Sequence, residues 1–159
     1  MTEEQITQWN YFGCGSRCII KLSEFHGKPI SADKFIEKFG QKYEAIWKTH
    51  LGLLDASDII DCCRELGLCG GAKFLRNPRI VKDLFRKKMN NGIFLITDLA
   101  YDPETGRLRD MFHTRLILSI PDGNEDWQIY HPDNTGKDCL MGISLEEMEA
   151  ELSHFLVLQ

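Results

Sequence analysis

Near the start of the chain, Gln8 and Cys14 have the residue types and the spacing needed for chemistry at a thiol. Cys14 comes just before a stretch with helical spacing of apolar residues, 16–25, and Gln8 precedes Cys14 by six positions. A cysteine that opens a helix lies beside free backbone N–H groups and the positive end of the helix dipole, which stabilise a thiolate. The amide of Gln8 then supplies one donor to an oxyanion that forms next to that thiolate.

A general base for this thiol is found far along the chain. His113 opens an apolar run, 113–120, that is typical of a strand. A cysteine followed much later by a histidine on a strand, and then by a polar orienting residue, predicts nucleophilic catalysis. In this arrangement Cys14 attacks an acyl carbon, and His113 accepts the thiol proton and later passes it to the leaving group.

Two residues compete for the role of orienting the imidazole, His131 and Asp133. A carboxylate stabilises an imidazolium and selects the tautomer of its ring, so charge favours Asp133. A neutral His131 orients the ring through a nitrogen lone pair but supplies no negative charge. Asp133 also belongs to the segment Pro-Asp-Asn-Thr-Gly, 132–136, whose composition is typical of a turn on its own. Both residues stay open as the third member.

The same thiols have structural interpretations. A cysteine taken alone is more often a small buried residue than a nucleophile, which is the alternative for Cys14. Cys18 is the rival nucleophile, but the residue six positions before it is Phe12, which has no donor for an oxyanion. We therefore expect Cys14 to be the low-pKa thiol and Cys18 to lie in the core.

The elements that must position these residues divide the chain into a helical half and a strand-rich half. Spacing of apolar residues and terminal serine, aspartate and glycine residues predict helices over 16–25, 31–39, 43–50 and 55–66. The second half predicts strands over 72–75, 93–99, 113–120, 127–130 and 154–158, with a helix over 78–89, a polar loop over 101–109 and a last helix opened by a Ser144/Glu147 capping box.

This order of elements predicts one α+β domain over residues 1–159, with an N-terminal helical subdomain packed on a C-terminal antiparallel sheet. The cysteine on a helix and the histidine on the sheet then face each other across a cleft. A chain of 159 residues is long enough to bury a single core of this kind.

Composition excludes several classes of function. Hydrophobic residues make up 43% of the chain and charged residues 27%, with a net charge of −5, which disfavours nucleic acid as a partner. The longest apolar runs, 93–96 and 116–120, have the length of strands and predict no membrane span. The acidic start, Met1 to Glu4, has no apolar segment after it, so we expect a cytoplasmic protein; secretion without a conventional leader is the alternative.

The six cysteines predict free thiols, because a reducing cytoplasm keeps them so. The four beyond Cys18 are Cys62, Cys63, Cys69 and Cys139. They lack the spacing of zinc ligands, since adjacent cysteines on a helix point about 100° apart. We expect neither a metal nor a cofactor.

An ordered set of segments along nearly the whole chain resembles the double-glycine leader peptidases. These are papain-like domains found at the front of bacteriocin-exporting ABC transporters and also as stand-alone proteins. The segments are Cys14-Gly15-x-x-Cys18 with its helix, 25–31, 52–54, 59–67, 91–96, His113, 127–132 and 144–148. Each is moderately specific by itself, and the order in which they occur is the stronger signal.

The resemblance implies a papain-like fold and a Cys/His/Asp catalyst with a glutamine in the oxyanion hole. Cys14 matches the nucleophile, His113 the base and Gln8 the oxyanion donor. The family usually has Asp-Pro at the end of the strand after the histidine, whereas this chain has His131-Pro132 followed by Asp133. The orienting role thus falls to His131 in place, or to Asp133 after a small shift of register.

The function predicted on these grounds is that of a papain-like cysteine peptidase that cleaves a peptide or protein through an acyl-enzyme. The resemblance implies small residues before the scissile bond. One alternative is a binding or regulatory module that keeps the fold with weakened or lost catalysis, which His131 at the position of an acid would favour. The other is an acyl or amide transferase that uses the same machinery.

Overall fold

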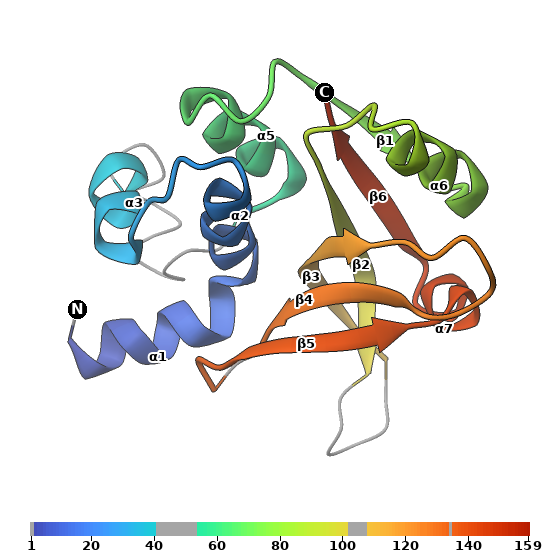
Figure 1. Ribbon diagram of the computed structural model, residues 1–159. Helices are drawn as coiled ribbons and strands as arrows, with labels where there is room; N and C mark the ends of the chain where they lie inside the picture. The colour runs from blue at the N-terminus through green and yellow to red at the C-terminus, as the bar shows by residue number, and fades with distance from the viewer. Residues whose placement is uncertain (1, 41–53, 102–107, 134) are drawn as a thin grey trace.

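The computed structural model describes residues 2–40, 54–101, 108–133 and 135–159. Their order along the chain is drawn in Figure 1. The helices are α1 (Glu3–Phe12), α2 (Cys14–Phe25), α3 (Ala32–Phe39), α5 (Ala56–Glu65), α6 (Pro78–Arg86) and α7 (Leu145–Ala150). The strands are β1 (Ala72–Leu75), β2 (Gly92–Tyr101), β3 (Leu108–Ser119), β4 (Trp127–Pro132), β5 (Asp138–Ile143) and β6 (Ser153–Leu158).

The strands form one six-stranded sheet in the order β1-β6-β2-β3-β4-β5, with every neighbouring pair antiparallel. The helices α1, α2, α3 and α5 lie on one side of this sheet, and α6 and α7 lie on the other (Figure 1). The α+β class and the helical layer against an antiparallel sheet, both expected from the sequence, are thus confirmed. Within the described ranges, no helix combines the length and apolar character needed to cross a membrane.

Alternation along the strands divides the buried side chains into two cores, because successive residues of a strand point to opposite faces. In β2, Phe94 and Ile96 pack against α2, whereas Ile93 and Leu95 pack against α6 and α7. The α2-side core also contains Cys18, Ile19, Leu22, Leu116, Tyr130 and Leu156. The α6/α7-side core contains Val81, Ile117, Trp127, Ile129, Met148 and Phe155.

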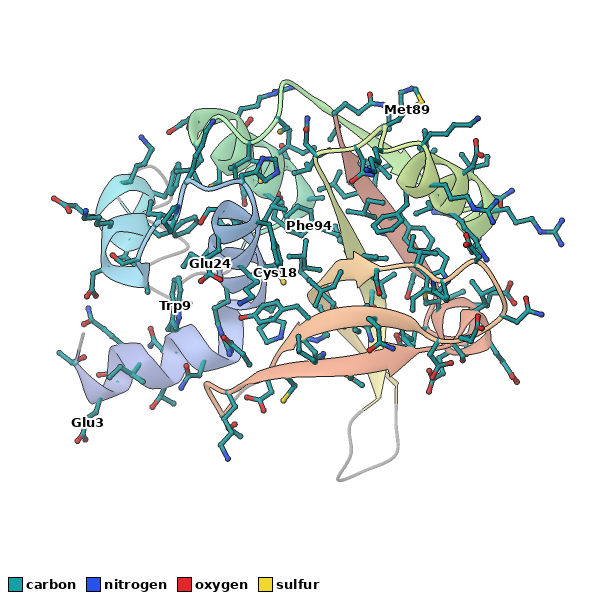
Figure 2. The ribbon with its side chains drawn as sticks, viewed as in Figure 1. Glu3, Trp9, Cys18, Glu24, Met89 and Phe94 are labelled. Atoms are coloured by element: carbon teal, nitrogen blue, oxygen red, sulfur yellow. The ribbon has the colours of Figure 1, made fainter. Side chains whose placement is uncertain are left out.

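Helix α2 is the element that joins the helical layer to the sheet. Its buried side chains Cys18, Ile19 and Leu22 recur at helical spacing and form one apolar stripe. Cys18 and Phe94 lie between α2 and the sheet (Figure 2). The helix ends before Gly27, which has a φ of 67°, the left-handed conformation that the sequence signal for a helix end requires.

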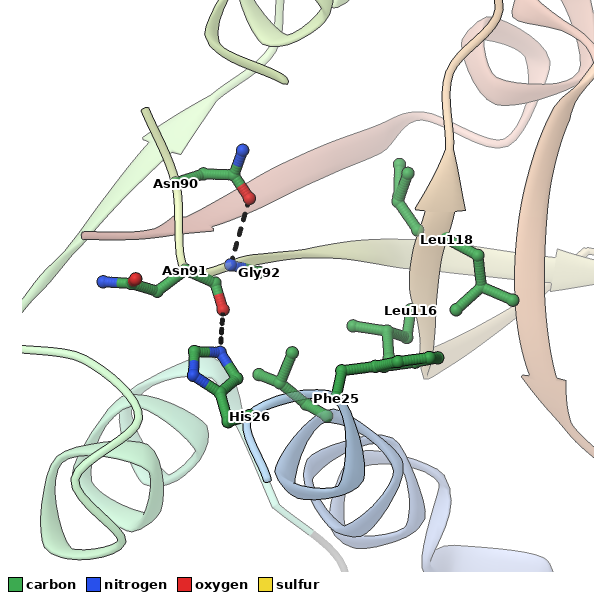
Figure 3. Close-up of a pocket in the computed structure, with 9 residues that line it drawn as sticks. Phe25, His26, Asn90, Asn91, Gly92, Leu116 and Leu118 are labelled. Atoms are coloured by element: carbon green, nitrogen blue, oxygen red, sulfur yellow. Dashed lines mark hydrogen bonds between the residues drawn. The ribbon is translucent and has the colours of Figure 1, made fainter. Parts of the chain in front are cut away.

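The C-terminal end of α2 is also tied to the start of β2. His26 Nε2 lies 2.6 Å from the carbonyl oxygen of Asn91, and the N–H of Gly92 donates to Oδ1 of Asn90 at 3.1 Å. These residues line a shallow pocket with Phe25 and Leu118 (Figure 3). Together with the apolar stripe, the contacts hold α2 in one position against the sheet.

The structure differs from the sequence predictions by two elements that were missed and one loop that is shorter. Helix α1 was not expected, because its capping box between Thr2 and Gln5 is followed by a largely polar surface without a clear apolar stripe. Strand β5 was missed because it lies at the edge of the sheet, where Leu140 is exposed. The loop expected over 101–109 is shorter, since β2 continues to Tyr101 and β3 begins at Leu108. The helix expected over 43–50 lies outside the described residues.

Gly92 tests how closely α2 packs on the sheet. Its φ is 146°, and a Cβ at this position would lie 2.8 Å from Cδ1 of Leu22. We expect Gly92→Ala to lower the free energy of unfolding by about 2 kcal/mol through strain and overpacking, measured from urea denaturation midpoints. Gly70→Ala is the matched control, because its Cβ would meet only the carbonyl oxygen of Gln159, at 3.8 Å. Equal midpoints for the two variants would contradict this account.

Candidate active site

Cys14 is the first residue of α2 and follows the N-cap residue Gly13. The helix therefore begins at the cysteine itself, two residues earlier than the apolar pattern predicts. Its partly buried thiol lies against Thr114 of β3, whose backbone and side chain both interact with it, and beside the N–H of Gly15. One turn further along, Cys18 is fully buried and its thiol donates to the carbonyl oxygen of Thr114 at 3.4 Å. The prediction that Cys18 lies in the core is confirmed.

The thiol of Cys14 is protonated at neutral pH. Burial raises its pKa above the usual range, and the hydrogen bonds from Thr114 and Gly15 and the charge of Arg17 only partly offset this effect. The expectation of a low-pKa thiol is therefore wrong for the resting protein. The helix terminus does supply donors, as the sequence suggests, but desolvation of the sulfur outweighs them.

His113 and His131 are brought together by the pairing of β3 with β4. Nε2 of His113 lies 3.2 Å from Nδ1 of His131, and the two rings meet edge to face with centroids 4.7 Å apart. One of these nitrogens carries the proton and donates to the other. Nδ1 of His113 takes no part in this hydrogen bond.

Asp133, which charge favours as the partner of His113, is engaged elsewhere. Its Oδ1 accepts from the backbone N–H and the hydroxyl of Thr135, at 3.0 and 2.8 Å, and from the N–H of Lys137 at 3.0 Å. Its Oδ2 accepts from the thiol of Cys139 at 3.5 Å. These bonds, with the hydroxyl of Thr135 the largest contribution, lower the pKa of Asp133. Because the turn uses the carboxylate for itself, the imidazole contact goes to His131 instead.

Strand parity places the two histidines and Thr114, the residue against the Cys14 thiol, on different faces of the sheet. Thr114 faces α2 together with Leu116, whereas His113 has the same strand parity as Arg115 and Ile117, which belong to the opposite face. In β4, His131 likewise has the parity of Ile129 in the α6/α7-side core. Among the described residues, no hydrogen bond joins Cys14 to His113, and the approach of the two side chains stays a prediction.

His113 is neutral in this environment. Burial lowers its pKa to about 3, and the charges of His131, Arg115 and Arg17 act in the same direction. Burial and Arg115 also lower the pKa of His131, whereas the carboxylate of Asp133 raises it. The Cys14 thiol and the His113 imidazole are therefore both neutral at rest, and they do not form a thiolate–imidazolium pair.

Two buried arginines near the histidines were not singled out in the sequence. Arg115 is 5% exposed and donates to Oγ1 of Thr97 and to Glu151, both at 2.5 Å. Arg17, in the first turn of α2, is 6% exposed and bonds to the turn between β4 and β5. A charge inside an apolar strand run, as at Arg115, is the signal that identifies such a residue from sequence.

The remaining expected site residue, Gln8, lies on α1 and is partly buried. Its role as an oxyanion donor stays a prediction. All six cysteines are free thiols. Across the ranges that the structure describes, no three His, Cys, Asp or Glu side chains are grouped so that they could hold a metal ion.

Comparison with known proteins supports the fold. No family model matches the chain, and no curated protein matches it. Among solved structures, it is similar to the peptidase domain of Streptococcus ComA, a bifunctional ABC transporter involved in a quorum sensing pathway. The similarity covers 93% of each chain with a TM-score of 0.57 and 16% sequence identity. This likeness confirms the papain-like peptidase fold expected from the sequence.

The neutral state of the Cys14 thiol determines how the rate of its alkylation depends on pH. We expect its alkylation by iodoacetamide to be slow at neutral pH and to rise only above the usual thiol pKa of about 8.5. The measurement is the rate of modification followed by peptide mapping, with Cys14→Ser to identify the adduct among the six cysteines. A plateau of reactivity at acidic pH would mean that an ion pair with His113 exists after all.

Burial of neutral His113 also makes the fold sensitive to acid. Between pH 6.5 and about 3, the unfolded chain binds a proton that the folded chain does not, so stability is fully present above pH 6.5 and falls as the pH decreases. When the pH is lowered from 7 to about 4.5, we expect the free energy of unfolding of His113→Gln to fall by about 2 kcal/mol less than that of the wild type. Urea midpoints measure this, with His26→Gln as the control. An equal fall of the free energy of unfolding in the wild type, His113→Gln and His26→Gln would show that His113 does not titrate in this way.

Proposed function

We propose that this chain is a papain-type cysteine peptidase in which Cys14 is the nucleophile and His113 the general base. The single observation that carries the proposal is the position of Cys14 in a peptidase-domain fold. It begins α2 and its thiol lies against Thr114, the residue that follows His113 in the chain. The substrate is a peptide or protein, and the resemblance of the sequence suggests small residues before the scissile bond.

The reaction starts from neutral groups. The thiol proton passes from Sγ of Cys14 to Nδ1 of His113 as Sγ bonds to the acyl carbon, and the carbonyl electrons move to its oxygen. The N–H of Cys14 and the amide of Gln8 hold that oxyanion. The proton then passes from His113 to the leaving amine, the C–N bond breaks, and water hydrolyses the acyl-enzyme in the same way. An amine in place of water would give acyl transfer.

For this transfer the imidazole of His113 must come within hydrogen-bond distance of Sγ of Cys14. That contact forms when a peptide binds, since catalytic hydrogen bonds often form only in the complex with substrate. Nε2–H of His113 donates to Nδ1 of His131, which leaves Nδ1 of His113 unprotonated and able to accept the thiol proton. Because His131 brings no negative charge, we expect a slower enzyme than one with a carboxylate at this position.

A second function is favoured by the same observations. The neutral thiol, the neutral imidazole and His131 at the position of an acid suit a module that binds a peptide in the papain-like fold without cleaving it. Such a module needs a surface that fits a peptide but neither the thiol nor the base.

Labelling with a peptide epoxide of the E-64 type separates the two functions. For a peptidase, intact mass reports one adduct that is absent in Cys14→Ala, and His113→Ala slows its formation by about 100-fold, the usual contribution of a general base. Cys139→Ala is the control and keeps the adduct. Labelling that does not depend on His113 would favour the binding module.

Restoring an acid tests the role of position 131. We expect His131→Asp to raise the pKa of His113 and to accelerate epoxide labelling at neutral pH by about tenfold, because a carboxylate stabilises the imidazolium. His131→Asn has nearly the same shape without the charge and serves as the matched control. Equal rates for the two variants would show that the missing charge does not limit the thiol.

A further inference from the structure

We infer that Arg17 is a positioning residue that holds the His131 end of β4 against the helix carrying Cys14. Its catalytic consequence rests on the proposed function, whereas its effect on the two histidines does not. Arg17 lies three residues after Cys14, in the first turn of α2. It is buried, so its charge requires partners inside the protein.

Among the described residues, the partners of the Arg17 guanidinium lie in the turn between β4 and β5 or at the first residue of β5. Nη1 donates to the carbonyl oxygen of Asp133, and Nη2 donates to the carbonyl oxygen of Lys137 at 2.9 Å and to Oδ1 of Asp138 at 3.2 Å. A planar guanidinium offers several donors in a rigid arrangement, so one side chain spans both ends of this turn. A lysine has one ammonium group and cannot reproduce that span.

Contacts other than those of Arg17 also stabilise the turn between β4 and β5. Inside it, the carboxylate of Asp133 bonds to Lys137 and Thr135, and Asp138 also accepts from the hydroxyl of Tyr130 at 2.6 Å. On its outer side, Gly136 lies so close to Asn10 of α1 that a Cβ would meet that side chain at 2.7 Å. In Figure 1 the turn, at the free end of β4 and β5, lies beside the junction of α1 and α2.

His131 is two residues before Asp133, with Pro132 between them. His131 pairs with Cys139 and Pro132 with Asp138 in the β4–β5 ladder, so a shift of the turn also displaces His131. The ring of His131 in turn bonds to Nε2 of His113. Arg17 therefore links the helix of the nucleophile to the orientation of the base through the turn, and not by touching either histidine.

Nuclear magnetic resonance of the imidazole nitrogens tests this link without relying on activity. In the wild type we expect His113 and His131 each to have the ring ¹⁵N shifts of one neutral tautomer, as their mutual hydrogen bond requires. In Arg17→Lys the carbonyl contacts are lost, and we expect those shifts to move to the averaged values of exchanging tautomers. Arg86→Lys is the matched control, because Arg86 pairs with Asp122 on the exposed surface of α6.

The effect of Arg17 on catalysis is measured by following the rate of epoxide labelling as a function of epoxide concentration. This gives the limiting rate kinact and the half-saturation concentration KI. We expect Arg17→Lys to lower kinact about tenfold or more with KI nearly unchanged, because misplacing a catalytic group affects the chemical step. If the wild type does not react, the proposed function fails, and the imidazole shifts still decide whether Arg17 positions the histidines.

If Arg17→Lys does not give a folded amide spectrum, Asp138→Ala replaces it, since it removes one of the three acceptors and leaves Arg17 in place. A smaller change of the imidazole shifts in the same direction then supports the inference. Unchanged shifts in a folded variant overturn it, because Arg17 would then stabilise the turn without affecting the histidines.

Discussion

The packing of α2 on the antiparallel sheet is the interaction on which the rest of the structure depends. Cys18 and Leu22 contribute the buried stripe of the helix, and Phe94 and Leu116 contribute the facing surface of β2 and β3. Because the stripe determines the rotation and position of the helix, it also determines where the first turn lies. Cys14 reaches Thr114 as a consequence of this apolar packing, and no polar contact of the thiol is needed to explain its location.

Two features of the sheet then determine the chemistry available to the thiol. Strand alternation sends Thr114 toward α2 and His113 toward the opposite face, so neighbours in sequence lie on different sides of a β-sheet. Burial favours the neutral form of each group. It therefore raises the pKa of the Cys14 thiol and lowers the pKa of the His113 imidazole. The site thus has the residues of a thiol peptidase in a resting state without an ion pair.

Charge in this region is carried by arginines rather than by the histidines. Arg115 is paired with Glu151, and Arg17 is paired with Asp138 and with two backbone carbonyls of the β4–β5 turn. Both guanidinium groups are buried, whereas their carboxylate partners reach solvent, so removing a partner would leave a buried arginine charge unpaired. The two arginines therefore hold β3 and the β4–β5 turn in place, and their positive charge opposes protonation of His113 and His131.

The sequence by itself determined what depends on neighbours along the chain. The end of α2 at Gly27, the Ser144 capping box, the buried Cys18 and the α+β class follow from local spacing and from short-range hydrogen bonds. Only the tertiary structure decided which residue meets His113, because Asp133 is consumed by its own turn and His131 is presented by the β3–β4 pairing. The same holds for the pKa of Cys14, since desolvation depends on what packs around the sulfur, and that is set by residues about 100 positions away in the chain.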